Sequence, residues 1–306
     1  MVTKRKVIKP QSKSVDFSWS RISPGVTVIN VPFTKSPEWA QSFLLCSDRH
    51  WDNPHSNWTM QKEHLDEARM RRAGVIENGD MFCAMQGKYD RRSDKSSVRA
   101  EHQYGDYLDR LVETAVDWWQ PWKDLFILCG EGNHEASIKD RHETDLIQRF
   151  CALLNANGAN VVSGGFGGFV RFRFAQSLNT GNLGMGQTVT LHYDHGYGGG
   201  GPVTHDAIQH QRRQVYLPDA EIIWSGHTHD SWTKIIARKR ISAKDVVYHD
   251  EVLHLKTSTY KDDYGAGEGG WHARTGKPPK ILGAYWLNFK WNSRKERIVF
   301  DVERAS

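Results

Sequence analysis

Apolar residues in the first half of the chain occur in short runs, and each run stops at a cluster of polar side chains. The runs rich in β-favouring residues cover residues 25–33, 41–47, 74–78 and 125–129. Such runs, bounded by turn residues, are typical of buried strands. Helices are predicted between them at about residues 58–72, 101–119 and 140–154. Alternating strands and helices favour an α/β architecture with parallel strands.

The second half of the chain has a different pattern, with many short strands and few helices. Strands are predicted at residues 161–162, 169–174, 188–193, 221–224, 233–241, 246–256, 281–289 and 297–302, with one helix near 204–215. This pattern favours a second sheet packed on the first. Because no internal repeat and no clear linker occur, we expect a basic flexible tail at residues 1–20 and a single domain at 21–306.

The composition, with 38% hydrophobic and 25% charged residues, is typical of a globular protein. No apolar run reaches the roughly 20 residues that a membrane span needs, and the lysine-rich start lacks the apolar segment of a secretory signal. We therefore expect a cytoplasmic protein without a membrane partner. The four cysteines show no metal-type spacing and are predicted to be reduced thiols. The net charge of +5 mildly favours anionic partners, such as a nucleotide, DNA or RNA.

The end of the predicted strand at residues 221–224 carries the most suggestive chemistry. The apolar run continues into Gly226 and two histidines, His227 and His229. Successive side chains of a regular strand alternate between faces, but a glycine that breaks the pleat would let both imidazoles converge beyond the sheet edge. Metal sites are commonly built at this edge in α/β proteins.

Polar donors also follow the other predicted strands. They are Asp48, His50, Asp80, Asn133, His134 and His195. Carboxylate, amide and neutral imidazole groups are suitable ligands for divalent transition metals. Without His134, and together with His227 and His229, the set contains seven ligands, which is more than one site with an open position needs. Seven ligands suit two metals that share a bridging carboxylate.

The order of these blocks along the chain resembles the calcineurin-like metallophosphoesterase superfamily. The blocks are Asp48-Arg49-His50, Gly79-Asp80, Gly132-Asn133-His134-Glu135, His195-Gly196 and Gly226-His227-Thr228-His229. The resemblance implies two mixed β-sheets packed as a sandwich and flanked by helices, a four-layer αββα arrangement. It also implies two divalent metal ions, such as Mn, Fe or Zn, at a centre between the sheet edges.

The resemblance further implies a role for each ligand. Asp48, His50 and His229 would hold one metal, Asn133, His195 and His227 would hold the other, and Asp80 would bridge them. The implied reaction is hydrolysis of a phosphate-ester substrate by a metal-bridging hydroxide, with His134 as the general acid. The enzyme would be a phosphatase or phosphodiesterase, and a nuclease is one form of the latter.

Several alternatives stay open at this point. Cys83 stands where the family commonly has an acidic residue, and His192 competes with His195 as a ligand. The partner of His134 is either Asp48 or a backbone carbonyl. A protein that keeps the fold but only binds nucleic acid, or acts as a scaffold, is the alternative function.

Flexible and basic segments near these blocks allow two interpretations each. The glycine-rich residues 196–202 are either a mobile loop beside the substrate site or a long turn into a helix. Arg91, Arg92, Arg212 and Arg213 either contact further phosphates or lie on a solvated face. Residues 265–272, another glycine-rich segment, have no assigned role.

Overall fold

The computed structural model describes residues 15–85, 93, 98–177, 183–201, 203–265 and 269–305. Arg91, Arg92 and most of the expected basic tail lie outside these residues. Strand β1 begins at Ser18, so regular structure starts within the segment that the sequence assigns to the tail.

Two mixed β-sheets form the centre of the protein, as the sequence predicts. The six-stranded sheet has the order β13 (Arg297–Ala305), β12 (Ala284–Asn292), β3 (Ala40–Cys46), β4 (Gly74–Glu77), β5 (Phe126–Cys129) and β6 (Val162–Ser163). Strands β3 to β6 are parallel, and β12 and β13 extend the sheet with antiparallel pairs.

The seven-stranded sheet combines the N-terminal strands with the middle of the chain. Its order is β1 (Ser18–Ser23), β2 (Val26–Phe33), β7 (Gly167–Ser177), β8 (Leu183–Asp194), β9 (Ile222–Ser225), β11 (Val247–Lys256) and β10 (Trp232–Ile241). Strands β8, β9 and β11 are parallel to one another. Their carboxyl ends therefore meet at one edge of this sheet.

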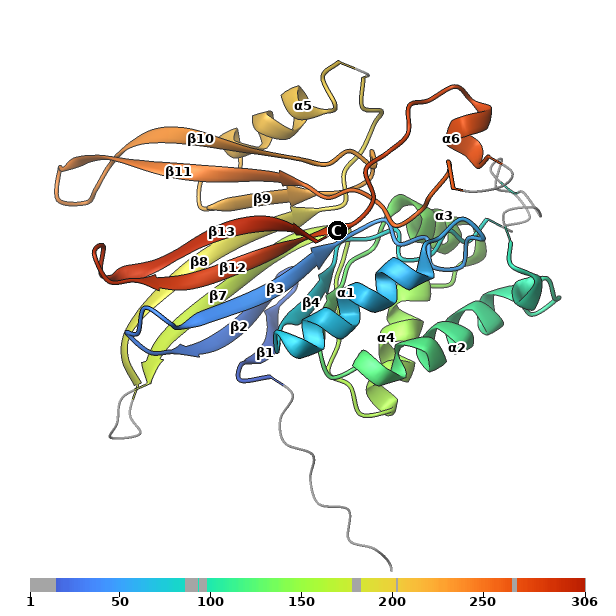
Figure 1. Ribbon diagram of the computed structural model, residues 1–306, viewed down its shortest axis with the longest axis horizontal. Coiled ribbons are helices and arrows are strands. Elements are labelled where there is room, and N and C mark those ends of the chain that lie inside the picture. Colours follow the sequence, from blue (N-terminus) through green and yellow to red (C-terminus); the bar gives the residue numbers. More distant parts are fainter. Residues whose placement is uncertain are drawn as a thin grey trace, which may run out of the picture.

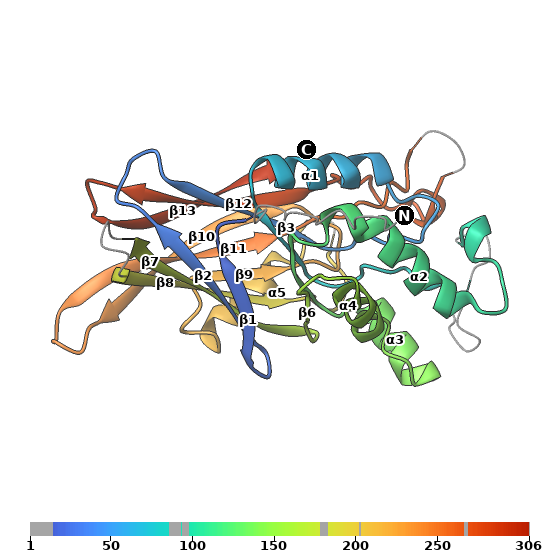
Figure 2. The ribbon, with the colours of Figure 1, turned by 90° about the horizontal axis from the view of Figure 1, so that it is seen from below.

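Helices flank the two sheets on opposite sides. The α-helices are α1 (Trp58–Met70), α2 (Tyr107–Trp119), α3 (Asn133–His142), α4 (Leu146–Ala156), α5 (Ala207–Arg212) and α6 (Trp271–Arg274). Short 3-10 helices are η2 (Ala100–His102), η3 (Gln120–Trp122) and η4 (Arg213–Val215). Figure 1 shows α5 beside β9, β10 and β11, away from α1, α2 and α4. The turned view shows α2 and α4 side by side (Figure 2). The fold is thus α/β, with helices outside both sheets.

Aromatic side chains fill the space between the sheets. Phe43 on β3 lies 4.8 Å from Phe172 on β7, measured between ring centroids, and Phe172 lies 4.9 Å from Phe289 on β12. Burial of apolar rings of this size is the main stabilising contribution in such a core. On the outer side, Trp119 of α2 stacks on Phe126 of β5 at 4.5 Å. Trp119, which is fully buried, therefore serves packing.

Two predicted helices have other boundaries in the structure. The helix expected at residues 101–119 starts only at Tyr107, because η2 precedes it and Gly105 separates the two. The helix expected at 140–154 is two helices, because Glu143 adopts a left-handed conformation with φ of 51° and Asp145 caps the second helix by accepting from the Gln148 amide at 2.9 Å. Helix α3 begins at Asn133, shortly after β5 and about two turns earlier than the sequence pattern indicates.

No helix among the described residues is long and apolar enough to cross a membrane.

Candidate metal centre

The predicted ligands come together at facing edges of the two sheets. Asp48, Asp80 and Asn133 follow β3, β4 and β5 of one sheet, and His195 and His227 follow β8 and β9 of the other. Backbone hydrogen bonds connect these loops. The Asp48 amide donates to the Gly79 carbonyl, and the Gly226 amide donates to the His195 carbonyl, both at 3.0 Å.

Asp48, His50 and His229 form one compact group, which we call the Asp48 group. One ligand atom of each lies within 4.8 Å of the others. His229 Nε2 is 3.3 Å from Asp48 Oδ1 and 3.2 Å from His50 Nε2. The remaining ring nitrogens, Nδ1 of His50 and Nδ1 of His229, are buried without a hydrogen-bond partner among the described residues. Two imidazoles and a carboxylate arranged in this way fit a divalent cation.

Asp80, His195 and His227 form a second compact group, the Asp80 group. His195 Nε2 lies 3.2 Å from Asp80 Oδ2. Asn133 is next to this group, because its Oδ1 lies 2.7 Å from Nδ1 of His227. The ligand set expected for the second metal is therefore assembled around Asp80.

Hydrogen bonds to the backbone orient both histidines of the Asp80 group. His195 Nδ1 lies 2.7 Å from the Asn78 carbonyl, and His227 Nε2 lies 2.9 Å from the Gly198 carbonyl. Because a carbonyl only accepts, these two nitrogens carry protons, and the opposite ring nitrogens are the ones that face the group. The glycine-rich loop thus borders the site through Gly198.

The two groups adjoin each other. Asp48 Oδ1 is 4.0 Å from His195 Nε2, so this carboxylate lies near ligands of both groups. Asp80 is placed with His195 and His227, and its role as the bridge stays a prediction.

The electrostatics of the site favour positive charge. Burial alone would lower the pKa of His195, but Asp80 and Asp48 outweigh it and raise that pKa to about 10. Burial would raise the pKa of Asp80, yet His195 and His134 hold it well below its usual range. The pKa of His50, by contrast, is lowered by burial and by His134. The two buried carboxylates thus create a local preference for positive charge.

Five of the seven predicted ligands adopt left-handed backbone conformations. Their φ values are 52° for Asp48, 43° for His50, 50° for Asp80, 75° for His227 and 57° for His229. Non-glycine residues rarely adopt this region, and each such position costs of the order of 1–2 kcal/mol. Strain of this kind gathers at functional sites, where the surrounding structure enforces it.

Gly226 allows the sheets to approach each other at this site. A Cβ atom at this position would collide with the Asp48 carboxylate and with Ser47. Ser47 Oγ in turn donates to Asp48 Oδ2 at 2.5 Å. The turn that brings the two histidines together arises from the positive φ of His227 and His229, and Gly226 provides the space for it.

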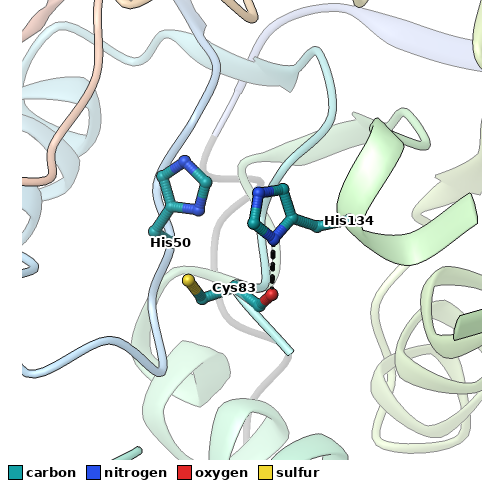
Figure 3. A group of neighbouring side chains, drawn as sticks. All are labelled: His50, Cys83 and His134. Atoms are coloured by element: carbon teal, nitrogen blue, oxygen red, sulfur yellow. Dashed lines mark hydrogen bonds between the residues drawn. The ribbon is translucent and has the colours of Figure 1, made fainter. Parts of the chain in front are cut away.

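His134 lies in the first turn of α3 with its ring beside both groups. Its amide donates to Asp80 Oδ1 at 3.0 Å, and its Nε2 is 3.8 Å from Asp80 Oδ2. Its Nδ1 donates to the Cys83 carbonyl at 2.5 Å (Figure 3). The partner of this ring nitrogen is therefore a backbone carbonyl, one of the two options that the sequence left open.

Two buried carboxylates hold the loop that follows β4. Glu135 accepts from the amides of Phe82 at 2.8 Å and Gly132 at 2.9 Å. Asp52 accepts from the amides of Cys83 at 2.5 Å and Ala84 at 2.9 Å. Asp52, from the loop after β3, therefore secures the segment that contains Cys83. Burial, with Asp52 nearby, raises the pKa of the Cys83 thiol to about 12.

His192 and Arg213 lie outside both groups. The His192 ring packs against Phe169 at 4.8 Å, and burial lowers its pKa to about 4. Arg213 is buried and pairs with Asp194 at 2.8 Å, so neither a phosphate contact nor a solvated face describes it. Arg212 is on the surface and donates to Gln209.

One histidine near the site had no assigned role in the sequence. His272, at the end of the segment 265–272, lies with its ring 5.5 Å from that of His229 and its Nδ1 3.2 Å from Asp263 Oδ2. Lys261 also pairs with Asp263, at 3.3 Å. No local pattern predicts the contact between His272 and His229, because the two residues are far apart in the sequence, His272 lying between β11 and β12.

Comparisons with known proteins add little to this picture. No family model and no curated protein sequence matches the chain. Among solved structures, a conserved uncharacterized protein from Streptococcus pneumoniae, described as a predicted phosphoesterase, aligns with 87% of this chain and 98% of its own at 11% identity and a TM-score of 0.30. GAP50, the anchor in the inner membrane complex of Plasmodium, aligns with 87% of this chain and 85% of its own at 9% identity and a TM-score of 0.38. Values this low transfer no function, so any function must be argued from the site itself.

Proposed function

We propose that the protein is a metal-dependent hydrolase of phosphoric esters with two divalent cations between its sheet edges. The observation that carries the proposal is the convergence of all seven predicted ligands from five loops into two adjoining groups. Isolated histidines usually serve packing or solvation, but a set with paired carboxylates and oriented imidazole rings suits a dinuclear centre.

Each group would hold one cation. Asp48, His50 and His229 would bind the first, Asn133, His195 and His227 the second, and Asp80 would be shared. The cations would supply the positive charge that polarises the phosphate ester and activates water. The protein contributes fixed ligand orientations, because backbone carbonyls hold His195 and His227 in place.

His134 would act as the general acid. Its Nδ1 proton is committed to the Cys83 carbonyl, which directs Nε2 towards Asp80 and the two groups. A proton on Nε2 can then pass to the leaving oxygen as the phosphorus–oxygen bond breaks. Glu135 and Asp52 would support this step by fixing the backbone on either side of the ring.

The substrate is a phosphomonoester or a phosphodiester. The net charge of +5 fits a nucleotide or nucleic-acid substrate. Parallel assays with para-nitrophenyl phosphate, bis(para-nitrophenyl) phosphate, and single- and double-stranded DNA separate these classes. Salt-sensitive DNA or RNA binding without hydrolysis at any divalent metal would instead favour a binding or scaffolding protein.

The test of the proposal is the replacement of Asp80 by asparagine, which tolerates a positive φ. Asp80→Asn and His227→Asn should lose both bound metal, measured by elemental analysis, and hydrolysis of para-nitrophenyl phosphate. His192→Gln is the matched control, because this histidine lies on the strand that leads to His195 but outside both groups. Full activity in a metal-free Asp80→Asn protein would refute the proposal.

A further inference from the structure

Cys83 places a sulfur atom beside the proposed centre. It lies three residues after Asp80 and is 1% exposed. Asn53 Nδ2 donates to its Sγ at 3.2 Å, which fixes the orientation of the thiol. Figure 3 shows the sulfur on the side of the loop where the rings of His50 and His134 also lie.

Two imidazoles face this thiol. Ligand atoms of His50, Cys83 and His134 lie within 4.8 Å of one another, and the two ring centroids are 5.0 Å apart. Since Nε2 of His50 faces His229, its Nδ1 is the nitrogen left for this group. That Nδ1 is buried and has no hydrogen-bond partner in the described part of the chain. A buried polar atom without a partner is costly, and a bound cation would satisfy it.

We propose that His50, Cys83 and His134 form a third metal site, selective for a thiophilic cation such as Zn²⁺, and that its occupancy inhibits the enzyme. One thiolate and two imidazoles are a common zinc ligand set with one position left for water. Binding converts the thiol to a thiolate and releases one proton. The inhibitory part of the inference rests on the proposed function, whereas the site itself does not.

Inhibition follows from the histidines that the site shares with the proposed centre. A cation on Nδ1 of His134 breaks its hydrogen bond to the Cys83 carbonyl, and a cation on Nε2 removes the proton that the ring would donate. A neutral imidazole offers one lone pair, so His50 cannot serve this site and the Asp48 group at once. Both effects weaken the reaction without blocking access to the centre.

Titration with Co²⁺ tests the site directly. Thiolate ligation gives Co²⁺ an intense charge-transfer absorption, and none of the seven ligands of the proposed centre contains sulfur. The band should therefore appear only when Co²⁺ occupies the third site, and activity towards an alkyl phosphate ester should fall with it, towards the roughly 10²-fold loss expected when a general acid is disabled. Cys83→Ser and Cys83→Ala should lack the band and keep their activity at excess Co²⁺ or Zn²⁺. Cys151→Ala, at a buried cysteine in α4, is the matched control and should behave like the wild type.

The outcomes separate the two proposals. A band that persists in both Cys83 variants, or no band at excess Co²⁺, overturns the third site. Equal inhibition of the wild type and both variants overturns its regulatory role. A band that depends on Cys83 in a protein that hydrolyses no phosphate ester supports the site and contradicts the proposed function.

Discussion

Replacing Asp52 by asparagine tests how His134 is held for proton transfer. The peptide unit between Cys83 and Ala84 connects the two side chains. Its N–H donates to Asp52 Oδ2 at 2.9 Å, and its carbonyl accepts from His134 Nδ1 at 2.5 Å. Hydrogen bonds that share one peptide unit polarise each other, so the carboxylate strengthens the bond that orients the ring. Asp52 would therefore be a positioning residue that acts through the backbone.

The size of the effect follows from the bonds that are lost. The carboxylate also accepts from the Cys83 amide, but asparagine has a single acceptor oxygen. One buried amide then loses its acceptor, which should lower the free energy of unfolding by about 1.5–3 kcal/mol. A less firmly held His134 should lower kcat for an alkyl phosphate about tenfold, or about 1.4 kcal/mol of activation free energy. Nitrophenolate leaves without protonation, so para-nitrophenyl phosphate should lose only about twofold.

The assay is a series of phosphate esters with leaving groups of rising pKa, with kcat and KM measured separately for each. The control is Tyr107→Phe, which removes the weaker 3.3 Å bond to Asp52 and leaves both amide bonds in place. Equal losses for all leaving groups, or a parallel loss of bound metal, would refute a role of Asp52 in orienting His134.

Three further predictions concern packing and charge. Gly132→Ala should abolish metal loading, measured by elemental analysis, because a Cβ at this position would collide with the Asp80 carboxylate and amide. The helix content in circular dichroism should persist. Normal metal loading would contradict this prediction. Lys256→Met should lower the free energy of unfolding in urea by about 3–5 kcal/mol, because it leaves the buried Asp206 carboxylate, 2.8 Å from Lys256 Nζ, without a counter-charge. The double change with Asp206→Asn should recover most of this loss, and no recovery would argue against the ion pair. Burial lowers the pKa of the His210 imidazole to about 2, whereas its pKa in the unfolded chain is about 6.5. The stability that the neutral ring contributes is therefore complete above about pH 6.5. The free energy of unfolding falls as pH falls, by about 3 kcal/mol at about pH 4. Urea unfolding of His210→Gln should show a weaker acid dependence, and an unchanged slope would exclude this histidine as the cause.

The strand pattern and the order of the ligand blocks could be predicted from the sequence. Strand β5 is a continuous apolar run and β3 ends in one, and their carboxyl ends fix where Asp48 and Asn133 must lie. The loop details could not be predicted, because they depend on contacts between distant segments. Asp52 supports the Cys83 loop from 31 positions away, and His272 reaches His229 from the connection between β11 and β12.

The predicted boundaries of the helix at residues 140–154 were wrong for a related reason. Glu143 has no intrinsic preference for a left-handed conformation, so the break between α3 and α4 is imposed by packing and by the cap at Asp145. Arg213 looks like a surface arginine in the sequence, and only the neighbouring strand provides Asp194 as its partner.

The left-handed backbone at five ligand positions provides an internal control for mutagenesis. Glycine adopts this conformation without strain. A glycine substitution at such a position, for example His229→Gly, removes a ligand and also relieves backbone strain. The metal-free variant should then melt at a higher temperature than the metal-free wild type. Loss of activity together with a raised Tm would separate the chemistry of a ligand from its contribution to folding, a distinction that alanine substitutions at the same positions obscure.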